Sequence, residues 1–301
     1  MDLKQLGWFV RVAELGSFTR AAATLDVSQS VLSRQVRALE TEVRQHLLYR
    51  NGRGATLTEP GQTLLAHAKG ILYQVEVARQ ELADRRGPTV GKVVIGVPPS
   101  LGRLLTVPVV TQFRKQFGKA SIGIVEGLTM SIQEWLLLGR LDFALLYDPT
   151  PATSLEYERV WSGELCLVGA PRAKPALPAT VKLTDLKRFP LIMPSRPHAV
   201  RNRVEAECAR HDVALDVTLE IDAIASILDM VQGGAGYAIL SRHALAGRGA
   251  GTQFSVARIV RPAITSQIVI ATSNQRPLTH LARRTIDLIK AEIAQQAALR
   301  Q

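Results

Sequence analysis

The stretch Ser17–Arg50, SFTRAAATLDVSQSVLSRQVRALETEVRQHLLYR, determines the architecture that we expect for this chain. Its second half carries apolar residues at every third or fourth position: Leu32, Val36, Leu39 and Val43. This spacing places them on one buried face of a helix. The opposite face carries side chains that can hydrogen bond to base edges and phosphates: Gln29, Ser30, Ser33, Arg34 and Arg37. Ser28 is expected to cap the helix, where free backbone amides favour a phosphate.

The residues before this helix fit a helix-turn-helix, which distinguishes it from an ordinary amphipathic surface helix. Ser17 can cap a short helix from Phe18 to Leu25, and Asp26 with Val27 leaves room only for a sharp turn. An earlier helix has apolar residues at helical spacing: Leu3, Leu6, Phe9, Val10 and Ala13. Three short helices around one small core, with the third facing outward, are the arrangement that places a recognition helix in a DNA groove.

The run DLKQLGWFVRVAELGSFTRAAATLDVSQSVLSRQVRALETEVRQHLLYRNGRGATLTEPG resembles the N-terminal domain of LysR-type transcriptional regulators. The small residues of the second helix, the Ser-Gln-Ser start of the third, its Leu-Ser-Arg-Gln-Val-Arg-Ala-Leu-Glu core and the later Leu-Thr-Glu-Pro-Gly occur in order. Ser30 stands where many members carry proline, and both residues suit the first turn of a helix. The resemblance implies an α/β protein with a winged helix-turn-helix domain, a linker helix and a two-lobed, periplasmic-binding-protein-like (type 2) effector domain.

Composition is consistent with a DNA-binding protein but does not locate the DNA site. The 301 residues include 37 basic and 26 acidic ones, a net charge of +11, which favours a polyanionic partner. Most of this excess falls after residue 91, outside the helix-turn-helix. The two cysteines, Cys166 and Cys208, are too few for a disulfide framework and have no metal-ligand spacing. We expect no cofactor, no metal, no signal peptide and no membrane span, and therefore a cytoplasmic protein.

A wing and a long helix are expected after the recognition helix. Residues 47–57 are typical of two short strands around a glycine turn, which would direct Arg50 and Arg53 toward the DNA backbone, although such a loop can also be merely solvated. From Glu59 a helix is predicted with a heptad seam: Leu64, Ala68, Ile71, Val75, Ala78 and Leu82. At about 40 Å it should pair with a second chain to form a dimer, the alternative being packing on its own domain. The resemblance further implies a tetramer.

The second half alternates short apolar strands with helices, a pattern that favours parallel sheets covered by helices. Strands are predicted over 93–97, 122–125, 141–147, 165–169, 191–193, 217–221, 237–240 and 268–272. Helices are predicted over 104–117, 131–138, 199–211, 224–232 and 279–295. The expected domains are 1–58 for DNA binding, 59–86 for the dimerising helix, 87–91 for a hinge and 92–301 for the effector domain. Its lobes are expected at 92–162 with 267–301, and at 163–266.

Ligands of such sheets lie beyond the carboxyl ends of the strands, near helix N-termini. Hydroxyl, imidazole and guanidinium groups follow strands in both predicted lobes, and the expected lining residues are Ser100, Thr129, Ser131, Tyr147, Ser195, Pro197, His198 and Arg201. Together they favour a small organic acid or other anion as effector, although each Ser or Thr can also be a simple helix cap. By the family resemblance, positions matching Ser100, Thr129 and His198 line the effector cleft.

Two rival classes have little support in the sequence. An enzyme with a DNA-binding appendage would be expected to show a nucleotide, metal or nucleophile motif, and none is present; His198 near Ser195 lacks an orienting acid. A transport-type solute-binding protein would suit the cleft but not the helix-turn-helix. The sequence therefore predicts a DNA-binding transcriptional regulator controlled by a small effector.

Overall fold

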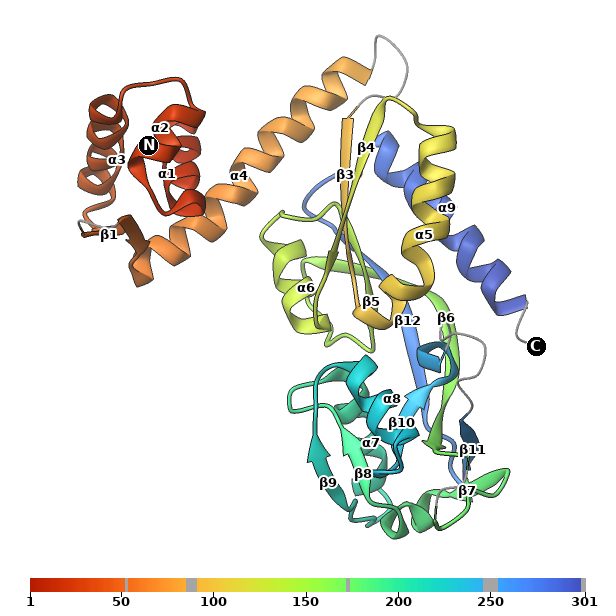
Figure 1. Ribbon diagram of the computed structural model, residues 1–301. Helices are drawn as coiled ribbons and strands as arrows, with labels where there is room; N and C mark the ends of the chain where they lie inside the picture. Colours follow the sequence, from red (N-terminus) through yellow and green to blue (C-terminus); the bar gives the residue numbers. More distant parts are fainter. Residues whose placement is uncertain (52–53, 85–90, 172–173, 246–253, 299–301) are drawn as a thin grey trace. The chain divides into compact units, whose positions relative to one another are not determined.

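The computed structural model describes residues 1–51, 54–84, 91–171, 174–245 and 254–298 (Figure 1). They form two compact units: Met1–Pro88 with Leu138–Arg140, and a larger one of Thr89–Leu137 with Leu141–Gln301. The first unit is mainly helical, whereas the second combines helices with an extended sheet. Among the described residues, no helix is both long and apolar enough to cross a membrane.

Three short helices build the core of the first unit: α1 (Leu3–Leu15), α2 (Phe18–Thr24) and α3 (Gln29–Val43). Each follows a residue whose side chain accepts a hydrogen bond from a first-turn amide, namely Asp2, Ser17 and Ser28. Such caps favour the helix start because those amides otherwise lack partners. The apolar face of α3 is fully buried in the shared core through Leu32, Val36 and Leu39. The predicted helix-turn-helix and the Ser28 cap are thereby confirmed.

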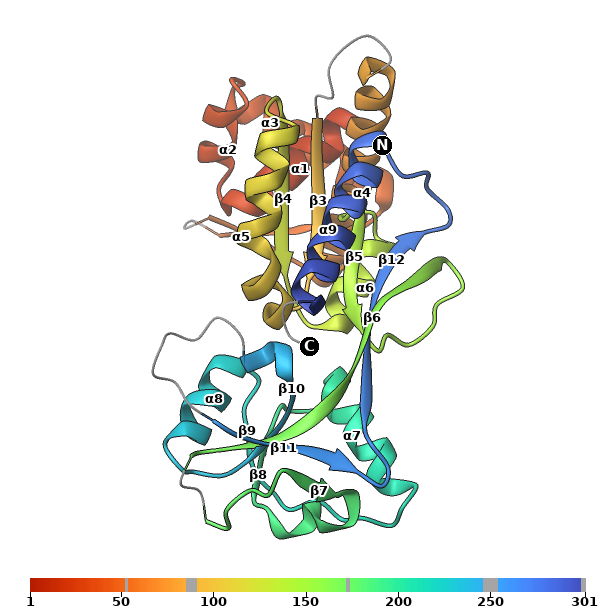
Figure 2. The same cartoon turned by 90° about the vertical axis from the view of Figure 1, so that its right-hand side faces the viewer.

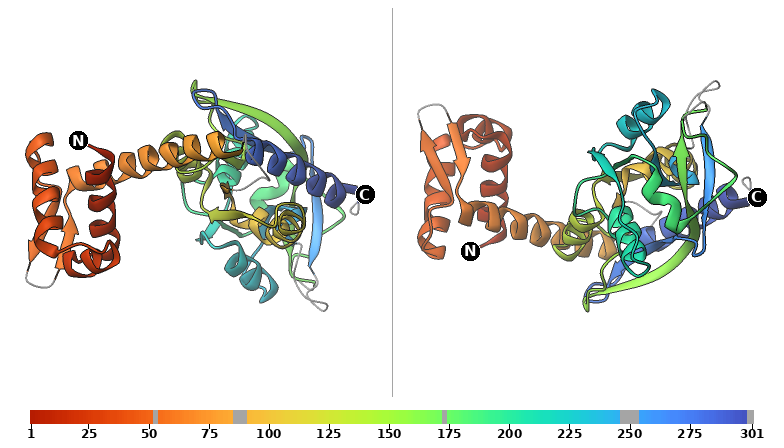
Figure 3. Two further views of the ribbon diagram at one scale, coloured as in Figure 1. Left: turned by 90° about the horizontal axis from the view of Figure 1, so that it is seen from above. Right: turned by 90° about the horizontal axis from the view of Figure 1, so that it is seen from below.

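A two-stranded hairpin, β1 (Leu48–Asn51) and β2 (Gly54–Leu57), follows α3 and lies beside the helices (Figure 3). Its position is fixed by buried Glu40 on α3, whose carboxylate accepts hydrogen bonds from the amides of Leu47 at 2.9 Å and Leu48 at 3.3 Å. A carboxylate that accepts backbone amides forms strong bonds. The wing therefore begins at a fixed point relative to the recognition helix.

The long helix α4 (Glu59–Asp84) is attached to this hairpin at its first turn. The Thr58 hydroxyl accepts a hydrogen bond from the Gly61 amide at 3.0 Å and donates one to the His46 carbonyl at 2.6 Å. A Cβ atom on Gly61 would lie 2.0 Å from the Leu47 carbonyl oxygen, so only glycine permits this close approach.

The apolar seam predicted for α4 divides between two uses. Leu64 and Ala68 pack against the core of the first unit, with Ala68 fully buried, which agrees with the alternative of packing within the chain. Ile71 is 38% exposed and Ala78 is also exposed. The side chain of Leu82 lies outside the described residues. The middle of the seam is therefore available for a partner, and its first turns are not.

The first lobe of the second unit is a sheet covered by helices on both faces. Its sheet order is β4-β3-β5-β12-β6, with β3 parallel to β4 and β5, and β12 antiparallel to β5 and β6. Alternate residues of a strand face opposite sides, so Phe143 and Leu145 pack with α5 and α9, whereas Ala144 and Leu146 pack with α6. Its elements are β3 (Gly91–Val97), α5 (Pro99–Gln116), β4 (Ala120–Glu126), α6 (Thr129–Leu137), β5 (Phe143–Tyr147), β12 (Thr265–Ser273) and α9 (His280–Ala298).

The second lobe has the same layered construction. The helix α7 packs on one side of its strands through Val204 and Cys208, and α8 packs on the other through Ile227 and Leu228. Its elements are β7 (Thr180–Lys182), the 3-10 helix η1 (Leu183–Arg188), β8 (Leu191–Met193), α7 (Ala199–Ala209), β9 (Val217–Glu220), α8 (Ile224–Gln232), β10 (Ala238–Ser241), the 3-10 helix η2 (Arg242–Leu245) and β11 (Ser255–Val260). The strands β8 and β9 are parallel, whereas β10 and β11 are antiparallel to β6.

Two long strands connect the lobes. β6 (Leu155–Gly169) pairs with β12 over its first ten residues and with β10 and β11 from Leu165 onward (Figure 2). The sequence predicted a strand only over 165–169, because the segment LEYERVWSGE before it is largely polar. The strands β7 and β11 were also missed, and the sheet is mixed rather than purely parallel, which corrects our expectation. The start of α5 lies at Pro99, five positions before the predicted start, because proline suits a first helical turn.

Candidate functional sites

The outward face of α3 is a continuous polar surface. Five of the predicted DNA-binding residues on it are exposed: Ser28, Gln29, Ser30, Arg34 and Arg37. Ser33, the sixth, is half-buried. Neither Arg34 nor Arg37 forms an ion pair with any described residue of the chain. Two guanidinium groups one helical turn apart are therefore free to contact phosphates or base edges.

The polar residues at the start of α3 are partly engaged with one another. The Ser28 hydroxyl accepts a hydrogen bond from the Val31 amide at 3.3 Å and lies 3.1 Å from the Ser30 hydroxyl. The Gln29 side-chain oxygen accepts one from the Thr19 hydroxyl of α2 at 3.5 Å. These contacts position the side chains before any DNA is bound, and the Gln29 amide nitrogen remains free to donate within the described part of the chain.

The wing adds an exposed aromatic residue that the sequence analysis did not single out. Tyr49 is 64% exposed, whereas its neighbour Leu48 is buried. The alternation of a strand with one buried face was the available signal. Of the two basic wing residues that we predicted, Arg53 lies outside the described residues, and so does the side chain of Arg50.

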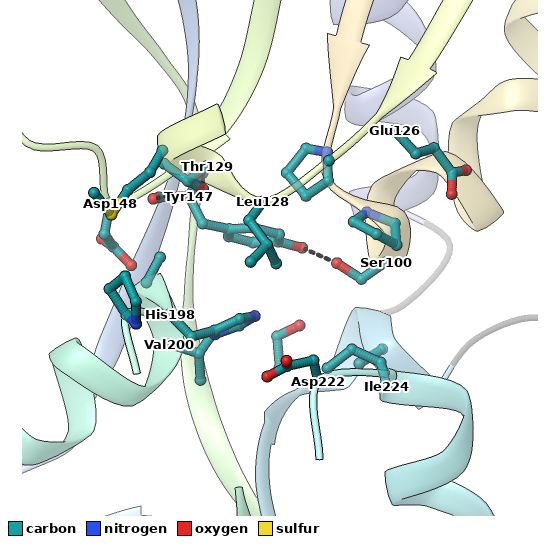
Figure 4. A pocket seen from close by; sticks show the side chains of 18 of the residues that line it. Ser100, Glu126, Leu128, Thr129, Tyr147, Asp148, His198, Val200, Asp222 and Ile224 are labelled. Carbon is teal, nitrogen blue, oxygen red and sulfur yellow. Dashed lines mark hydrogen bonds between the residues drawn. The ribbon is translucent and has the colours of Figure 1, made fainter. Parts of the chain in front are cut away.

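The second candidate site is a cavity of about 330 Å³ between the two lobes (Figure 4). That volume suits a small organic molecule, since ligand pockets are typically about 300–1,000 Å³. The starts of α5, α6, α7 and α8 all line it, together with the end of β5. Five of our predicted effector residues contribute to the lining: Ser100, Thr129, Tyr147, Pro197 and His198.

Three of the helix starts at this cavity, those of α5, α7 and α8, lack side-chain caps. The residues before α5, α7 and α8 are Pro98, His198 and Ala223, and none of them makes a side-chain cap hydrogen bond. Proline and alanine have no acceptor to offer. The positive ends of these helix dipoles therefore face the cavity without compensation by a capping side chain, which favours a ligand that carries acceptor oxygens.

Tyr147 links the walls of the cavity. Its phenol oxygen accepts a hydrogen bond from the Ser100 hydroxyl at 3.3 Å (Figure 4). The Ser241 hydroxyl of the second lobe also interacts with the phenol. Burial raises the pKa of Tyr147, and these two hydroxyls oppose the effect. The Thr129 hydroxyl lies 3.4 Å from both the amide nitrogen and the carbonyl oxygen of Tyr147. A ligand that displaced the phenol would therefore affect both lobes.

His198 offers an unsatisfied polar atom at the wall. Its Nδ1 atom is buried and has no hydrogen-bond partner among the described residues. Burial lowers the pKa of His198, and the nearby Asp222 carboxylate opposes this effect. Since the ordinary histidine pKa is about 6.5, the ring is neutral at neutral pH. The neutral His198 ring can therefore form a hydrogen bond with a ligand without adding positive charge to the cavity.

Arg201 does not line the cavity, which corrects our expectation. Its buried guanidinium donates to Glu205 at 2.8 Å and to Glu220 at 2.7 Å. It also donates to the Pro194 carbonyl at 2.8 Å. A buried charge requires such partners, and these bonds tie α7 to the ends of β8 and β9. Arg201 therefore has a structural role here.

Ser131 and Ser195 are likewise absent from the cavity lining. Ser131 lies in the first turn of α6, two residues after Thr129, so its side chain leaves the helix on a different side. The Ser195 amide donates to the Asp222 carboxylate at 2.8 Å. The sequence placed Ser131, Ser195 and Arg201 correctly near helix starts but could not determine whether their side chains face the cavity.

The ion pairs around Arg201 lead to a pH-dependent stability prediction. Two hydrogen bonds from the Arg196 guanidinium, at 2.9 and 2.7 Å, lower the pKa of Glu205, and Arg201 adds to this shift. A lowered folded-state pKa stabilises the protein above the unfolded pKa, about 4.3 for glutamate, and the contribution is lost as pH falls through the folded value. We expect Glu205→Gln to lower the melting temperature at pH 7, with a gap that closes below pH 4.3.

Melting followed by circular dichroism from pH 7 to pH 3 measures this gap. Glu134→Gln is the control, because Glu134 is exposed on α6 and has no ion pair among the described residues. A Glu205 gap that stays constant with pH would contradict the assigned role of the carboxylate.

Several charged lining residues were not predicted. Glu126, Asp148 and Asp222 bring carboxylates to the cavity, and Arg103 brings a guanidinium. The available signal was the place of the three carboxylates at strand ends: Glu126 is the last residue of β4, Asp148 directly follows β5, and Asp222 lies two residues after β9. This matches the rule that was applied only to hydroxyl and basic residues. The wall is therefore more acidic than the expected anion site.

A helix-turn-helix unit followed by a two-lobed unit with an interlobe cavity defines a class of DNA-binding regulators that carry a ligand-binding domain. Residues 86–294 match the family model described as LysR substrate binding domain. Residues 3–62 match the model described as bacterial regulatory helix-turn-helix protein, lysR family. The chain belongs to the LysR family of DNA-binding transcriptional regulators, a family of regulators and not of enzymes.

Individual relatives agree with this membership. The chain is similar to the nitrogen assimilation regulatory protein nac of Klebsiella aerogenes, with 30% identity over 291 residues that cover 96% of this chain and 94% of the relative. The transcriptional regulator AlsR of Bacillus subtilis is 34% identical over 195 residues, which cover 64% of each protein.

Solved structures share the fold. A full-length OxyR variant from Pseudomonas aeruginosa superposes with a TM-score of 0.74 at 22% identity, covering 97% of this chain and 94% of that one. CbnR, a LysR family transcriptional regulator, superposes with a TM-score of 0.72 at 21% identity, covering 97% of this chain and 99% of that one. CbnR in complex with its target DNA superposes with a TM-score of 0.73 at 21% identity, covering 97% of this chain and 100% of that one. The predicted fold class is thereby confirmed.

Proposed function

We propose that the outward face of α3 reads operator DNA in the major groove. The residues that we assign to this contact are Ser28, Gln29, Ser30, Ser33, Arg34 and Arg37, with Arg50 and Arg53 of the wing on the phosphate backbone. Support comes from the exposure of Arg34 and Arg37 and the absence of an ion pair for either among the described residues. CbnR, which shares the fold, has been solved with its target DNA.

The proposed DNA-binding form is a homodimer joined through α4. Met1, Leu3 and Ile71 are exposed apolar side chains around one shallow groove between α1 and α4. Exposed apolar residues gathered in one place favour a protein partner. Two recognition helices held at a fixed separation would read an inverted repeat and gain the selectivity that a single helix lacks. A tetramer and a cytoplasmic location are proposed from the family alone.

The proposed signal is a small organic acid bound in the interlobe cavity. The observation that carries this proposal is the convergence of uncapped helix starts from both lobes on one cavity. We assign effector contacts to Ser100, Thr129, Tyr147, Pro197 and His198. The domains that we propose are 1–58 for DNA binding, 59–86 for the dimerising helix, 87–91 for the hinge and 92–301 for the effector domain. Within the effector domain, the chain is proposed to cross between the lobes near residues 162 and 266.

In the proposed mechanism the effector shifts a conformational equilibrium. Tyr147 contacts Ser100 of the first lobe and Ser241 of the second. The strands β6 and β12 connect the lobes and would act as the hinge about which the lobes open and close. An effector that favours one closure of the lobes would change how the effector domains pack in the oligomer, and through this the spacing of the DNA-reading helices. Only an effector with different affinities for the two closures can do so.

A thermal-shift screen of small organic acids tests the cavity. A ligand at 100 times its Kd stabilises the folded chain by about 2.7 kcal/mol, so a true effector should raise the Tm in a concentration-dependent way. The control is Ala223→Phe, which places a large side chain in the cavity at the exposed start of α8. A compound that stabilises this variant as much as the parent binds elsewhere and would count against the proposed site.

A further inference from the structure

The charges in the cavity do not suit an effector that is only an anion. Three carboxylates line it, from Glu126, Asp148 and Asp222, against the single guanidinium of Arg103 among the described lining residues. His198 adds no positive charge because burial lowers its pKa. A second acid group on the ligand would meet like charge, which is unfavourable in a partly closed site.

Two of these carboxylates differ in what they already bind. Asp148 is committed to the interlobe strand β12, since one oxygen accepts from the Ser266 hydroxyl at 2.5 Å and the other from the Gln267 amide at 3.0 Å. Asp222 uses only Oδ1, which accepts from the Ser195 amide, and its Oδ2 has no partner within the described part of the chain. Of these two carboxylates, Asp222 is therefore the one with an oxygen free to bind a ligand.

The position of Asp222 completes the argument. It lies beside His198 on the second-lobe side of the cavity, and Ser100 and Tyr147 lie on the opposite side (Figure 4). The side of the cavity near Asp222 therefore carries a carboxylate beside the starts of α7 and α8, whereas the opposite side carries the uncapped start of α5 at Ser100. A molecule of amino-acid size can reach both.

We infer that the effector is an amino acid or a close analogue, with its ammonium group on Asp222 and its carboxylate at the start of α5 near Ser100. This inference rests on the proposed function of the cavity and adds the class of ligand. An ammonium group can use the free Asp222 oxygen in a charge-assisted hydrogen bond. A carboxylate can accept from the Ser100 hydroxyl and benefits from the helix dipole. An organic acid that lacks the amino group could bind at the start of α5 but would leave Asp222 without a partner for its free oxygen.

A matched thermal-shift panel on the full chain tests the ligand class. Each of the twenty standard amino acids is compared at 10 mM, where available as a stable compound, with the 2-oxo acid and the primary amine of the same side chain. We expect at least one amino acid to raise the Tm in a saturable way, and its oxo acid and amine to leave the Tm unchanged. Isothermal titration of the stabilising amino acid then gives its Kd.

Asp222→Asn should raise the Kd for this amino acid at least 10-fold. The Asn side-chain oxygen can still accept a hydrogen bond from the Ser195 amide, so the fold should be preserved. Asp216→Asn is the matched control, because Asp216 is exposed in the same lobe and does not line the cavity. An oxo acid that stabilises as well as its amino acid, or an unchanged Kd in Asp222→Asn, overturns the inference but leaves the effector cavity standing. If no acid of any kind stabilises the chain, the inference and the proposed cavity both fail.

Discussion

Replacing Arg34 by alanine is expected to weaken binding to operator DNA by about 10-fold or more. A guanidinium in the major groove can form a bidentate contact with a base edge, and each such contact contributes about 1–3 kcal/mol. Arg34 is exposed on the face of α3 opposite the buried residues Leu32 and Val36. Fluorescence anisotropy with a labelled operator duplex, at one fixed salt concentration, measures the change.

The control for this experiment is Arg114→Ala. Arg114 is exposed on α5 in the second unit and has no ion pair among the described residues, so its removal lowers the net charge equally without touching α3. The proposed reading face predicts near-parental affinity for this control. Equal losses in both variants would indicate a general charge effect, and an unchanged affinity in Arg34→Ala would show that α3 is placed wrongly on the DNA.

The second large effect is expected at the effector cavity. Replacing Ser100 by alanine should raise the concentration of effector needed for half-maximal stabilisation by about 10-fold, because a hydrogen bond to a charged ligand contributes about 1.5–3 kcal/mol. The hydroxyl donates to Tyr147 in the free chain and lies at the uncapped start of α5. Thermal shift with the ligand identified by screening gives the concentration dependence.

Ser131→Ala separates a cavity role from a helix-start role. Ser131 lies in the first turn of α6 but not in the cavity lining, so its loss should leave the effector response unchanged. DNA affinity without effector should stay at the parental value in both variants. A full effector response in Ser100→Ala would count against the cavity as the effector site.

Much of the first unit was predictable because its signals are local. The spacing of Leu32, Val36 and Leu39 determines which face of α3 is buried, and Ser28 marks its start. Whether the α4 seam faces the chain or a partner was not predictable, since Ala68 is buried by residues distant in sequence. A heptad pattern specifies a buried stripe, not the surface that buries it.

The effector cavity shows the same limit at the level of single residues. Helix starts after strands were recognisable, which brought Ser100, Thr129 and His198 to the cavity as expected. Arg201 was misjudged because its partner Glu220 arrives from β9, nineteen positions later. The polar first half of β6 was missed because its partner strand β12 lies about a hundred residues away. Contacts that are distant in sequence leave no periodic signal.

The most direct test of the central claim is a binding-site selection with the purified full chain and a pool of random duplex DNA. If two copies present their α3 faces to one duplex, the enriched sequences should converge on an inverted repeat, with half-sites a whole number of helical turns apart, about 10–10.5 base pairs for each turn. Convergence on a single half-site without symmetry, or no enrichment above the starting pool, would contradict the account.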